Sequence, residues 1–363
     1  MIRTKSKETL MEKRRCNIRD LAQAAKLSPG TVSRILNNRP GDMNIPETTR
    51  RRVVELAREM QYVPNIHAQR LFSKNSGVIG LVIPSAKRNG APVFAEGHLP
   101  LILAGMEERL DASSRRIELI INNGDFIEKQ SYLSLFRNGS LDGLLVWGAY
   151  EDEQFWQELV DARFPYVFIG TYPRLRSWVN CVSNDYAFAA GKITENVLKV
   201  GHRQVLFLDD AANRSTTFHR KFGVAAAIEH RRMTPECVRY RQAADRDEAI
   251  HLLNEERDGG FRYTAVVTAN FRLAVWAREA LTARGLRIPE DVSIATGDAY
   301  PGEAAGWPEL TRIETDDRQI GAEACRAIES IIDADDPFLI NKALEGTPIY
   351  GNTVRSLNGR EMD

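Results

Sequence analysis

The most informative stretch of the chain is residues 17–37, which read NIRDLAQAAKLSPGTVSRILN. Asn17 is a typical N-cap residue, and Asp20 places an acidic side chain in the first turn of the helix that follows. Apolar residues then recur at helical spacing, at Ile18, Leu21, Ala22 and Ala25. Ser28 and Pro29 open a second helix, because serine suits the N-cap and proline suits the first helical position. The stretch therefore predicts two short helices joined by a tight turn.

The second of these helices has two different faces. Its apolar side chains are Val32, Ile35 and Leu36, and its polar or basic side chains are Thr31, Ser33, Arg34 and Asn37. Two short helices of this kind are typical of a helix-turn-helix that reads DNA. A third helix is predicted from Pro46 and Glu47 onward, with an apolar face made by Val53, Leu56, Ala57 and Met60. The N-terminal region is therefore predicted to be a small all-α unit.

The distribution of charge separates this region from the rest of the chain. The 363 residues include 49 Lys and Arg and 49 Asp and Glu, so the net charge is zero. Residues 1–75 alone hold 16 basic and 7 acidic residues, which leaves 33 basic and 42 acidic residues in the remainder. A basic head on an acidic body indicates a nucleic-acid partner for the head, with a solvated basic tail as the alternative.

Composition excludes several other classes of protein. Hydrophobic residues make up 43% of the chain and charged residues 27%, which is typical of a globular protein. The four cysteines are far apart, so neither a disulfide scaffold nor a cysteine-based zinc site is expected, and a reducing compartment fits. No apolar run approaches the ~18–20 residues of a membrane helix, and the first twenty residues lack the apolar core of a secretory signal. We therefore expect a cytoplasmic protein without a membrane partner.

The N-terminal region resembles the headpiece of the LacI/GalR family of bacterial transcription regulators. Besides residues 17–37, the segment YVPN at residues 62–65, with Ala68 and Leu71, is similar to the family's hinge pattern Y-x-P-N-x-x-A-x-x-L. A strand-like run, GVIGLVIP, follows at residues 77–84. The resemblance implies a helix-turn-helix headpiece over residues 16–62 and a hinge over residues 63–76.

The resemblance also implies which residues contact DNA. Pro29 and Gly30 match the two positions at the start of the recognition helix that choose bases. Neither carries a polar side chain, so more weight falls on Arg34, which can donate to guanine O6 and N7, with a contact to phosphate only as the alternative. Residues that match positions near phosphates or neighbouring bases are Thr31, Ser33 and Asn37. Leu71 matches the hinge leucine that enters the minor groove at the centre of a pseudo-palindromic operator and kinks the DNA, with a role in packing the linker as the alternative.

Beyond residue 77, short apolar runs alternate with helical patterns. Strands are predicted at residues 77–84, 117–122, 143–148, 166–171, 179–184, 204–208, 265–269, 292–297 and 310–314. Helices are predicted between them, for example at residues 100–114, 186–200, 271–284 and 317–333. The alternation indicates parallel sheets covered by helices, and nine strands indicate two lobes. The resemblance implies a periplasmic-binding-protein-like effector domain, with one subdomain at residues 77–172 plus 316–334 and the other at residues 173–315 plus 335–357.

Ligands of open parallel sheets bind beyond the carboxyl ends of the strands. Polar residues stand at those ends here: Ser85, Asn122, Asn123, Thr171, Asp185, Asp209, Asp210, Asn270 and Asp298. Hydroxyl, amide and carboxylate groups suit a polyhydroxylated ligand. The resemblance assigns effector contacts to Phe94, Arg220, Asn270 and Asp298. Asp185 is instead expected to cap the following helix, and Asp209 and Asp210 are expected to lie in a loop.

Taken with these patterns, the resemblance implies a homodimeric repressor. Its affinity for double-stranded operator DNA would be controlled by a small effector, a sugar, bound between the lobes. Two alternatives keep the fold: a non-sugar effector such as a nucleobase, and a ligand-binding protein without a role in transcription. An enzyme is not expected, because the chain lacks P-loop, G-x-G-x-x-G and G-x-S-x-G patterns and its six histidines show no metal-binding spacing. No cofactor, no catalytic residue and no metal is predicted.

Overall fold

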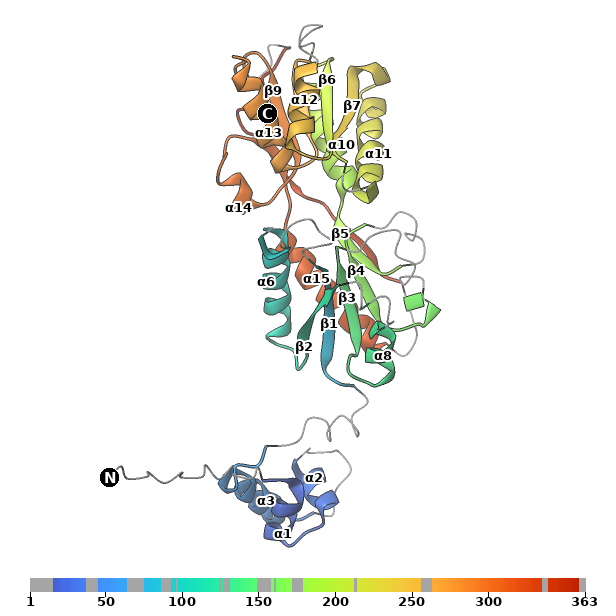
Figure 1. The fold of residues 1–363 in the computed structure, drawn as a ribbon, viewed down its shortest axis with the longest axis vertical. Coiled ribbons are helices and arrows are strands. Elements are labelled where there is room, and N and C mark those ends of the chain that lie inside the picture. The colour runs from blue at the N-terminus through green and yellow to red at the C-terminus, as the bar shows by residue number, and fades with distance from the viewer. Residues whose placement is uncertain are drawn as a thin grey trace, which may run out of the picture. The chain divides into compact units, whose positions relative to one another are not determined.

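The fold is taken from a computed structural model of the chain (Figure 1). It describes residues 16–36, 45–63, 75–85, 93–95, 97–123, 126, 131–148, 158–159, 161–171, 179–211, 214–255, 263–334 and 339–358. The chain divides into two compact units, Met1–Ser76 and Gly77–Asp363. The predicted positions Asn37, Ala68 and Leu71 lie outside the described residues.

The first unit is helical, as predicted. Its helices are α1 (Ile18–Ala25), α2 (Pro29–Leu36) and α3 (Glu47–Glu59). Its core consists of apolar residues on the inner faces of all three helices: Leu21, Ala22, Ala25, Val32, Ile35 and Val53. The apolar spacing read from the sequence therefore identified the buried faces of α1 and α2 correctly.

Local hydrogen bonds set the ends of α1 and the start of α2. Asn17 and Asp20 form a capping box, in which Asn17 Oδ1 accepts from two backbone N–H groups and Asp20 Oδ2 accepts from the Asn17 N–H at 2.9 Å. Lys26 ends α1 in the left-handed region with φ of 56°. Ser28 Oγ then accepts from the Thr31 N–H at 3.1 Å. These contacts satisfy backbone groups that the short helices leave without partners, and they define the tight turn.

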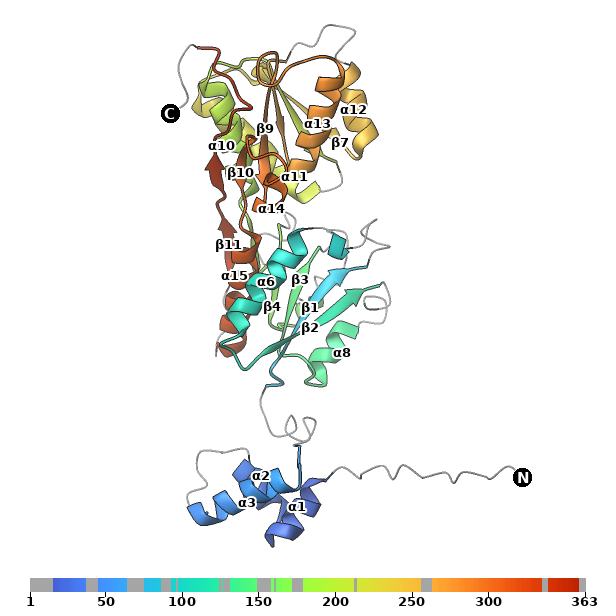
Figure 2. The same cartoon turned by 90° about the vertical axis from the view of Figure 1, so that its left-hand side faces the viewer.

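The second unit consists of two lobes, each built on a six-stranded sheet (Figures 1 and 2). The first sheet has the order β11-β5-β4-β3-β1-β2 and is parallel throughout. Its strands are β1 (Val78–Pro84), β2 (Arg116–Asn122), β3 (Gly143–Trp147), β4 (Tyr166–Ile169), β5 (Cys181–Asn184) and β11 (Asn341–Leu344). The second sheet has the order β12-β10-β9-β8-β6-β7, with β12 antiparallel to β10. Its strands are β6 (Val205–Asp210), β7 (Val238–Ala243), β8 (Ala265–Thr268), β9 (Ser293–Ala299), β10 (Thr311–Glu314) and β12 (Thr347–Ile349).

Helices cover both faces of each sheet. In the first lobe, α6 and α15 pack on one face and α8 on the other. In the second lobe, α10 and α11 pack on one face and α13 on the other. The bounds in the first lobe are η1 (Val93–Ala95), α6 (His98–Leu110), α8 (Ser131–Arg137) and α15 (Asp317–Asp333). Those in the second lobe are α10 (Tyr186–Lys199), α11 (Arg214–His230), η2 (Pro235–Cys237), α12 (Arg246–Glu255), α13 (Phe271–Ala283) and α14 (Pro301–Ala304).

Within the described residues, the chain crosses between the lobes at three places: Asp185 before α10, residues 315–316 between β10 and α15, and residues 345–346 between β11 and β12. The predicted boundaries after residues 172 and 334 are therefore wrong. Residues 179–184 and 341–344 belong to the first lobe, because β5 and β11 pair with each other there as parallel strands. This pairing joins segments 160 residues apart, so no local pattern in the sequence indicates it.

Glycines allow α6 and α15 to approach closely in the first lobe. A Cβ atom added at Gly105 of α6 would lie 1.8 Å from the backbone oxygen of Arg318, and one added at Gly321 of α15 would lie 2.0 Å from that of Ile102. Larger residues would push the helices apart. The close crossing brings the N-terminal ends of α6 and α15 together, so that His98 and Asp317 come into contact.

Burial of His202 in the second lobe leads to a prediction about acid stability. The His202 ring is fully buried, with Nδ1 2.8 Å from Thr264 Oγ1 and Nε2 3.1 Å from the carbonyl oxygen of Arg355. Burial lowers the pKa of His202 from 6.5 to about 4. The unfolded chain therefore binds a proton between these pH values that the folded chain does not bind, so stability falls as the pH decreases through this window. We expect a contribution on the order of 3 kcal/mol to be lost there.

Chemical denaturation of the parent chain and of His202→Gln at a series of pH values measures this contribution. The variant should lose less stability than the parent between pH 6.5 and about 4. His230→Gln is the matched control, because the His230 side chain is 73% exposed. Equal acid sensitivity in the parent and in His202→Gln would contradict the assignment.

Candidate functional site

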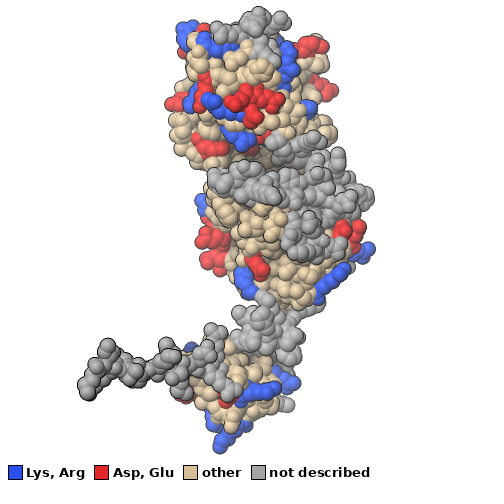
Figure 3. All heavy atoms as spheres, in the orientation of Figure 1, with Lys and Arg blue, Asp and Glu red and all other residues tan. Residues whose placement is uncertain are grey.

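The outer face of α2 is the candidate DNA-reading surface. Val32 and Ile35 are buried against the other helices, whereas Pro29, Gly30 and Arg34 are exposed. Thr31 and Ser33 are partly buried, and the Thr31 hydroxyl lies 2.8 Å from Ser28 Oγ in the cap of the helix. The predicted DNA contacts that the structure describes therefore share the face of α2 that does not pack against the core. Figure 3 shows Lys and Arg side chains over this helical unit.

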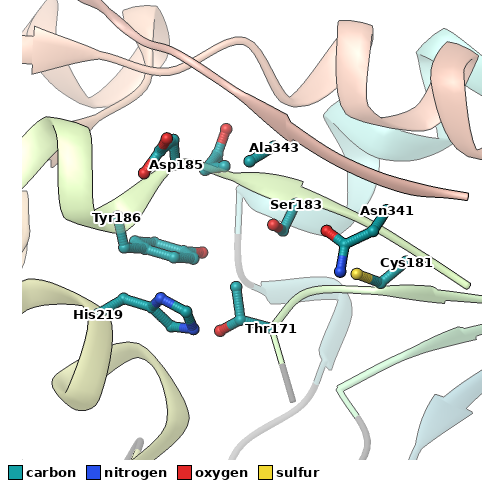
Figure 4. Close-up of a pocket in the computed structure, with 9 residues that line it drawn as sticks. Thr171, Cys181, Ser183, Asp185, Tyr186, His219, Asn341 and Ala343 are labelled. Carbon is teal, nitrogen blue, oxygen red and sulfur yellow. The ribbon is translucent and has the colours of Figure 1, made fainter. Parts of the chain in front are cut away.

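In the second unit, the candidate effector site lies where the two lobes meet. A pocket is lined there by strand ends of the first lobe and by α10 and α11 of the second (Figure 4). Its lining residues are Thr171, Cys181, Ser183, Asn184, Asp185, Tyr186, His219, Asn341 and Ala343. In Figure 4 the side chains of Tyr186, His219 and Thr171 converge on one space. Asp185 caps α10 by accepting from the Phe188 N–H at 2.9 Å, as predicted.

Arg220 of α11 contacts Tyr186, one of the residues that line this pocket. Its guanidinium is 5.1 Å from the centre of the Tyr186 ring and donates to Asp209 Oδ1 at 2.9 Å and to Thr216 Oγ1 at 3.0 Å. Arg220 is only 6% exposed. Its ion pair with Asp209 joins it to the carboxyl end of β6. The contact to an effector stays a prediction. The charge of Arg220 is already balanced by Asp209, which the sequence did not indicate.

Asp209 and Asp210 are the last two residues of β6, so the prediction that they lie in a loop is wrong. Asp209 is fully buried and accepts hydrogen bonds from Arg220, from Thr217 Oγ1 at 2.8 Å and from the hydroxyl of Tyr240. Burial and the charge of Asp209 raise the pKa of Tyr240, which stays protonated and remains a donor. A carboxylate with this many donors is a structural anchor of the site. The sequence did not indicate this role, because the partners of Asp209 lie on other elements, α11 and β7.

Two other predicted contacts, Asn270 and Asp298, also have partners within the protein. Asn270 caps α13, with Oδ1 accepting from the Leu273 N–H at 3.0 Å and Nδ2 3.5 Å from Asp210 Oδ2. Arg272 donates to the same Asp210 oxygen at 2.8 Å. The second arginine at this end of the sheet is therefore also paired with a carboxylate. Asn270 keeps its place beside the site, but its amide oxygen is committed to the helix.

Asp298, at the carboxyl end of β9, is buried and accepts from Thr315 Oγ1 at 3.0 Å. Burial raises the pKa of Asp298, and the neighbouring charge of Asp317 adds to the effect. Asp317 in turn lies 2.8 Å from His98 Nδ1 and accepts from Asn184 Nδ2 at 3.4 Å. Phe94 lies in η1 with its side chain 54% exposed, so it is not part of this buried cluster.

A continuous polar cluster therefore connects the lobes at two of the crossings. The chain of contacts includes four residues that the sequence analysis did not select: His98, Tyr186, Thr315 and Asp317. Tyr186 follows the predicted cap Asp185, and Asp317 starts a predicted helix, so both had a weak signal in the sequence. His98 had none, because it comes close to Asp317 only when α6 packs on α15.

In the part of the chain that the structure describes, no group of three or more His, Cys, Asp or Glu side chains is arranged to hold a metal ion. Across the same residues, no helix combines the length and the apolar character needed to span a membrane.

Comparisons with known proteins match a described family to each of the two units. Residues 17–65 match the family described as "Bacterial regulatory proteins, lacI family", and residues 194–354 match "Periplasmic binding protein-like domain". The transcriptional regulator MalR of Streptococcus pneumoniae is 26% identical over 60% of this chain. That alignment spans 64% of MalR, just under two thirds of its length.

Solved structures with this fold include two regulators. One is the lac repressor dimer bound to operator and the anti-inducer ONPF, with a TM-score of 0.72, 21% identity and coverage of 94% of this chain and 99% of that chain. The other is the complex of the regulator CelR with cellobiose, with a TM-score of 0.64, 23% identity and coverage of 93% and 100%. The predicted fold class is confirmed, and these relatives are transcription regulators, in agreement with the prediction that the chain is not an enzyme. The chain thus combines a helix-turn-helix domain of the lacI family of bacterial regulatory proteins with a two-lobed periplasmic-binding-protein-like domain.

Proposed function

We propose that the protein is a sequence-specific transcriptional repressor whose affinity for operator DNA is controlled by a sugar bound between its two lobes. The observation that carries this proposal is Arg220. It is buried, it contacts Tyr186, which lines the pocket between the lobes, and it is balanced by Asp209. A ligand that hydrogen-bonds there would bind differently in different lobe arrangements, which is what control of a second site requires.

On the DNA side, the exposed face of α2 supports reading of the major groove. Arg34 supplies a forked donor for guanine, and Pro29 and Gly30 leave room for close approach at the start of the helix. We propose that two subunits bind a pseudo-palindromic operator, because a two-fold DNA site is read best by a two-fold protein. The lac repressor, which has this fold, is a dimer in its complex with operator. Leu71 is proposed to enter the minor groove between the half-sites.

On the effector side, the charges favour an uncharged polyhydroxylated ligand. Arg220 is paired with Asp209, and Arg272 is paired with Asp210, so neither arginine offers an unbalanced positive charge to an anion. Hydroxyl and amide groups remain around the pocket, at Thr171, Ser183 and Asn184. Such groups donate to and accept from sugar hydroxyls. The CelR complex contains cellobiose, a neutral sugar, in a protein of the same fold.

A thermal-shift screen of the full-length chain tests the effector half of the proposal. Neutral sugars, sugar acids, sugar phosphates and nucleobases are compared at equal concentration. A neutral sugar present at ~100 times its Kd should stabilise the protein by ~2.7 kcal/mol and raise its melting temperature. Each hit is then added to the complex with DNA selected from a random library, and the operator affinity is measured again. A hit confined to nucleobases would replace the sugar with the alternative effector class.

The DNA half is tested separately by salt dependence. Binding that depends on several phosphate contacts should weaken steeply as the salt concentration rises. A chain that binds sugars but shows no selective, salt-dependent binding to any DNA would instead be a ligand-binding protein without a role in transcription.

A further inference from the structure

The two lobes touch directly at a point outside the pocket, between the start of α6 and the end of β9. His98 of the first lobe meets Tyr300 of the second edge-on, with ring centres 5.2 Å apart and an interplanar angle of 69°. The neighbouring residue, Gly97, packs so closely on Tyr300 that an added Cβ atom would lie 1.8 Å from the tyrosine hydroxyl oxygen. Figures 1 and 2 both show α14, which follows Tyr300, beside the N-terminal end of α6.

Charge reinforces this contact across the lobes. His98 is held from its own lobe by Asp317, whose Oδ2 lies 2.8 Å from Nδ1. From the second lobe it faces the carboxyl groups of Asp298 and Glu303, which act on it electrostatically, and the phenol of Tyr300. A protonated His98 therefore stands between a carboxylate of the first lobe and two carboxyl groups of the second. Without its charge, these acidic groups would face one another directly.

We propose that Gly97, His98 and Tyr300 form a clasp between the lobes that holds them in the arrangement seen here. His98 acts as a positioning residue, because it joins Asp317 of its own lobe to the acidic end of β9 and α14 in the other. The clasp rests on the contacts within the two-lobed unit. Its consequence for operator affinity rests on the proposed function, because an effector can shift the lobes only against the contacts that hold them.

The clasp should weaken as the pH rises. Burial lowers the pKa of His98, but the hydrogen bond with Asp317 and the charges of Asp298, Asp317 and Glu303 outweigh this effect and raise it to about 9. Burial raises the pKa of Glu303 to about 7. Closure thus retains protons that separated lobes would release. Asp317 stays beside His98 when the lobes separate, so the part of the shift that depends on closure comes from Asp298 and Glu303. This contribution is lost as the pH rises through about 9.

The distance between spin labels on the two lobes measures the clasp without any ligand. One label is attached through Arg137→Cys on α8 and the other through Asp247→Cys on α12, both at exposed positions. The full chain carries Cys16→Ser, since the other three cysteines are buried. We expect the parent distance distribution to shift between about pH 6 and about pH 10, as His98 loses its proton.

Three variants separate the clasp from other effects of pH. His98→Gln should lose the pH-dependent shift and show the separated distribution already at neutral pH, whereas His98→Lys should keep the neutral-pH distribution and move the shift to higher pH. Gly97→Ala should separate the lobes at every pH by displacing the Tyr300 ring, since Gly97 has helical backbone angles that alanine also adopts. His230→Gln is the control, because His230 pairs with Glu195 inside the second lobe.

A parent distribution that does not change over this pH range would overturn the clasp, and so would a shift that persists in His98→Gln. If Gly97→Ala does not fold, the comparison of His98→Gln with His98→Lys still decides between these outcomes. Because no sugar or DNA is present, a negative result here leaves the proposed effector and operator functions to be judged by their own tests.

Discussion

Replacing Asp209 with alanine is expected to lower the free energy of unfolding of the two-lobed unit by about 3–5 kcal/mol. Asp209 is fully buried, and its partner Arg220 is 6% exposed. Removal of the carboxylate leaves the guanidinium in a site shielded from water without a counter-charge. The hydroxyl groups of Thr217 and Tyr240 lose their acceptor at the same time. Chemical denaturation followed by far-ultraviolet circular dichroism measures the change.

Two comparisons isolate the buried pair. Arg220→Ala combined with Asp209→Ala should cost less than the sum of the two single replacements, because the double variant leaves no unpaired charge. Glu279→Ala removes a partner of Arg246 at a site where both side chains are about half exposed, and it should cost less than about 1 kcal/mol. A loss for Asp209→Ala no larger than that for Glu279→Ala would show that the buried pair does not anchor the site.

The second large effect is expected at the DNA-reading surface. Arg34→Ala should weaken binding to the preferred operator, once that sequence has been selected, by about 10- to 100-fold, or about 1–3 kcal/mol. Arg34 lies in the last turn of α2, exposed on the face opposite Val32 and Ile35. If it reads a guanine, the loss on random DNA should be much smaller than the loss on the operator. Equilibrium binding to both DNAs at several salt concentrations provides the measurement.

Arg58→Ala on α3 is the matched control, because Arg58 is an exposed arginine of the same unit on a different helix. It should affect operator and random DNA about equally if it affects either. Equal losses on both DNAs for Arg34→Ala, together with a salt slope reduced by about 1, would mean that Arg34 contacts phosphate only. The choice of bases would then have to come from other residues of α2.

Local patterns predicted most of the secondary structure. The cap at Asn17 and the pair Ser28-Pro29 marked the starts of α1 and α2, and the strands β1 to β6 and β8 to β10 were all expected near their observed positions. The strands that were missed are β7, β11 and β12. β7 reads VRYRQA and β11 reads NKAL, so both lack the continuous apolar run of a central strand. They form where a neighbouring strand supplies hydrogen-bond partners, and not where the sequence is most apolar.

The functional site was predicted less completely than the fold. Asp185 and Asn270 were selected because they end strands, and both cap the helices that follow. Arg220 and Asp298 were assigned through the resemblance, and the structure places both in the buried cluster between the lobes. Asp209, which balances the charge of Arg220, was predicted to lie in a loop. His98, which acts electrostatically on Asp298, was not selected. Each of these partners lies on a different element from the residue it contacts.

The sequence by itself thus determined the helix-turn-helix unit, its resemblance to the lacI family and the alternation of strands and helices behind it. These features depend on caps, turns and apolar spacing, which act over a few residues. The membership of β5 and β11 in the first lobe, the burial of Asp209 and the contact of His98 with Tyr300 required the folded chain. Each depends on contacts between different helices and strands, some of them far apart in the sequence, such as β5 with β11 and His98 with Tyr300. Such contacts exist only after the sheets and helices have packed together.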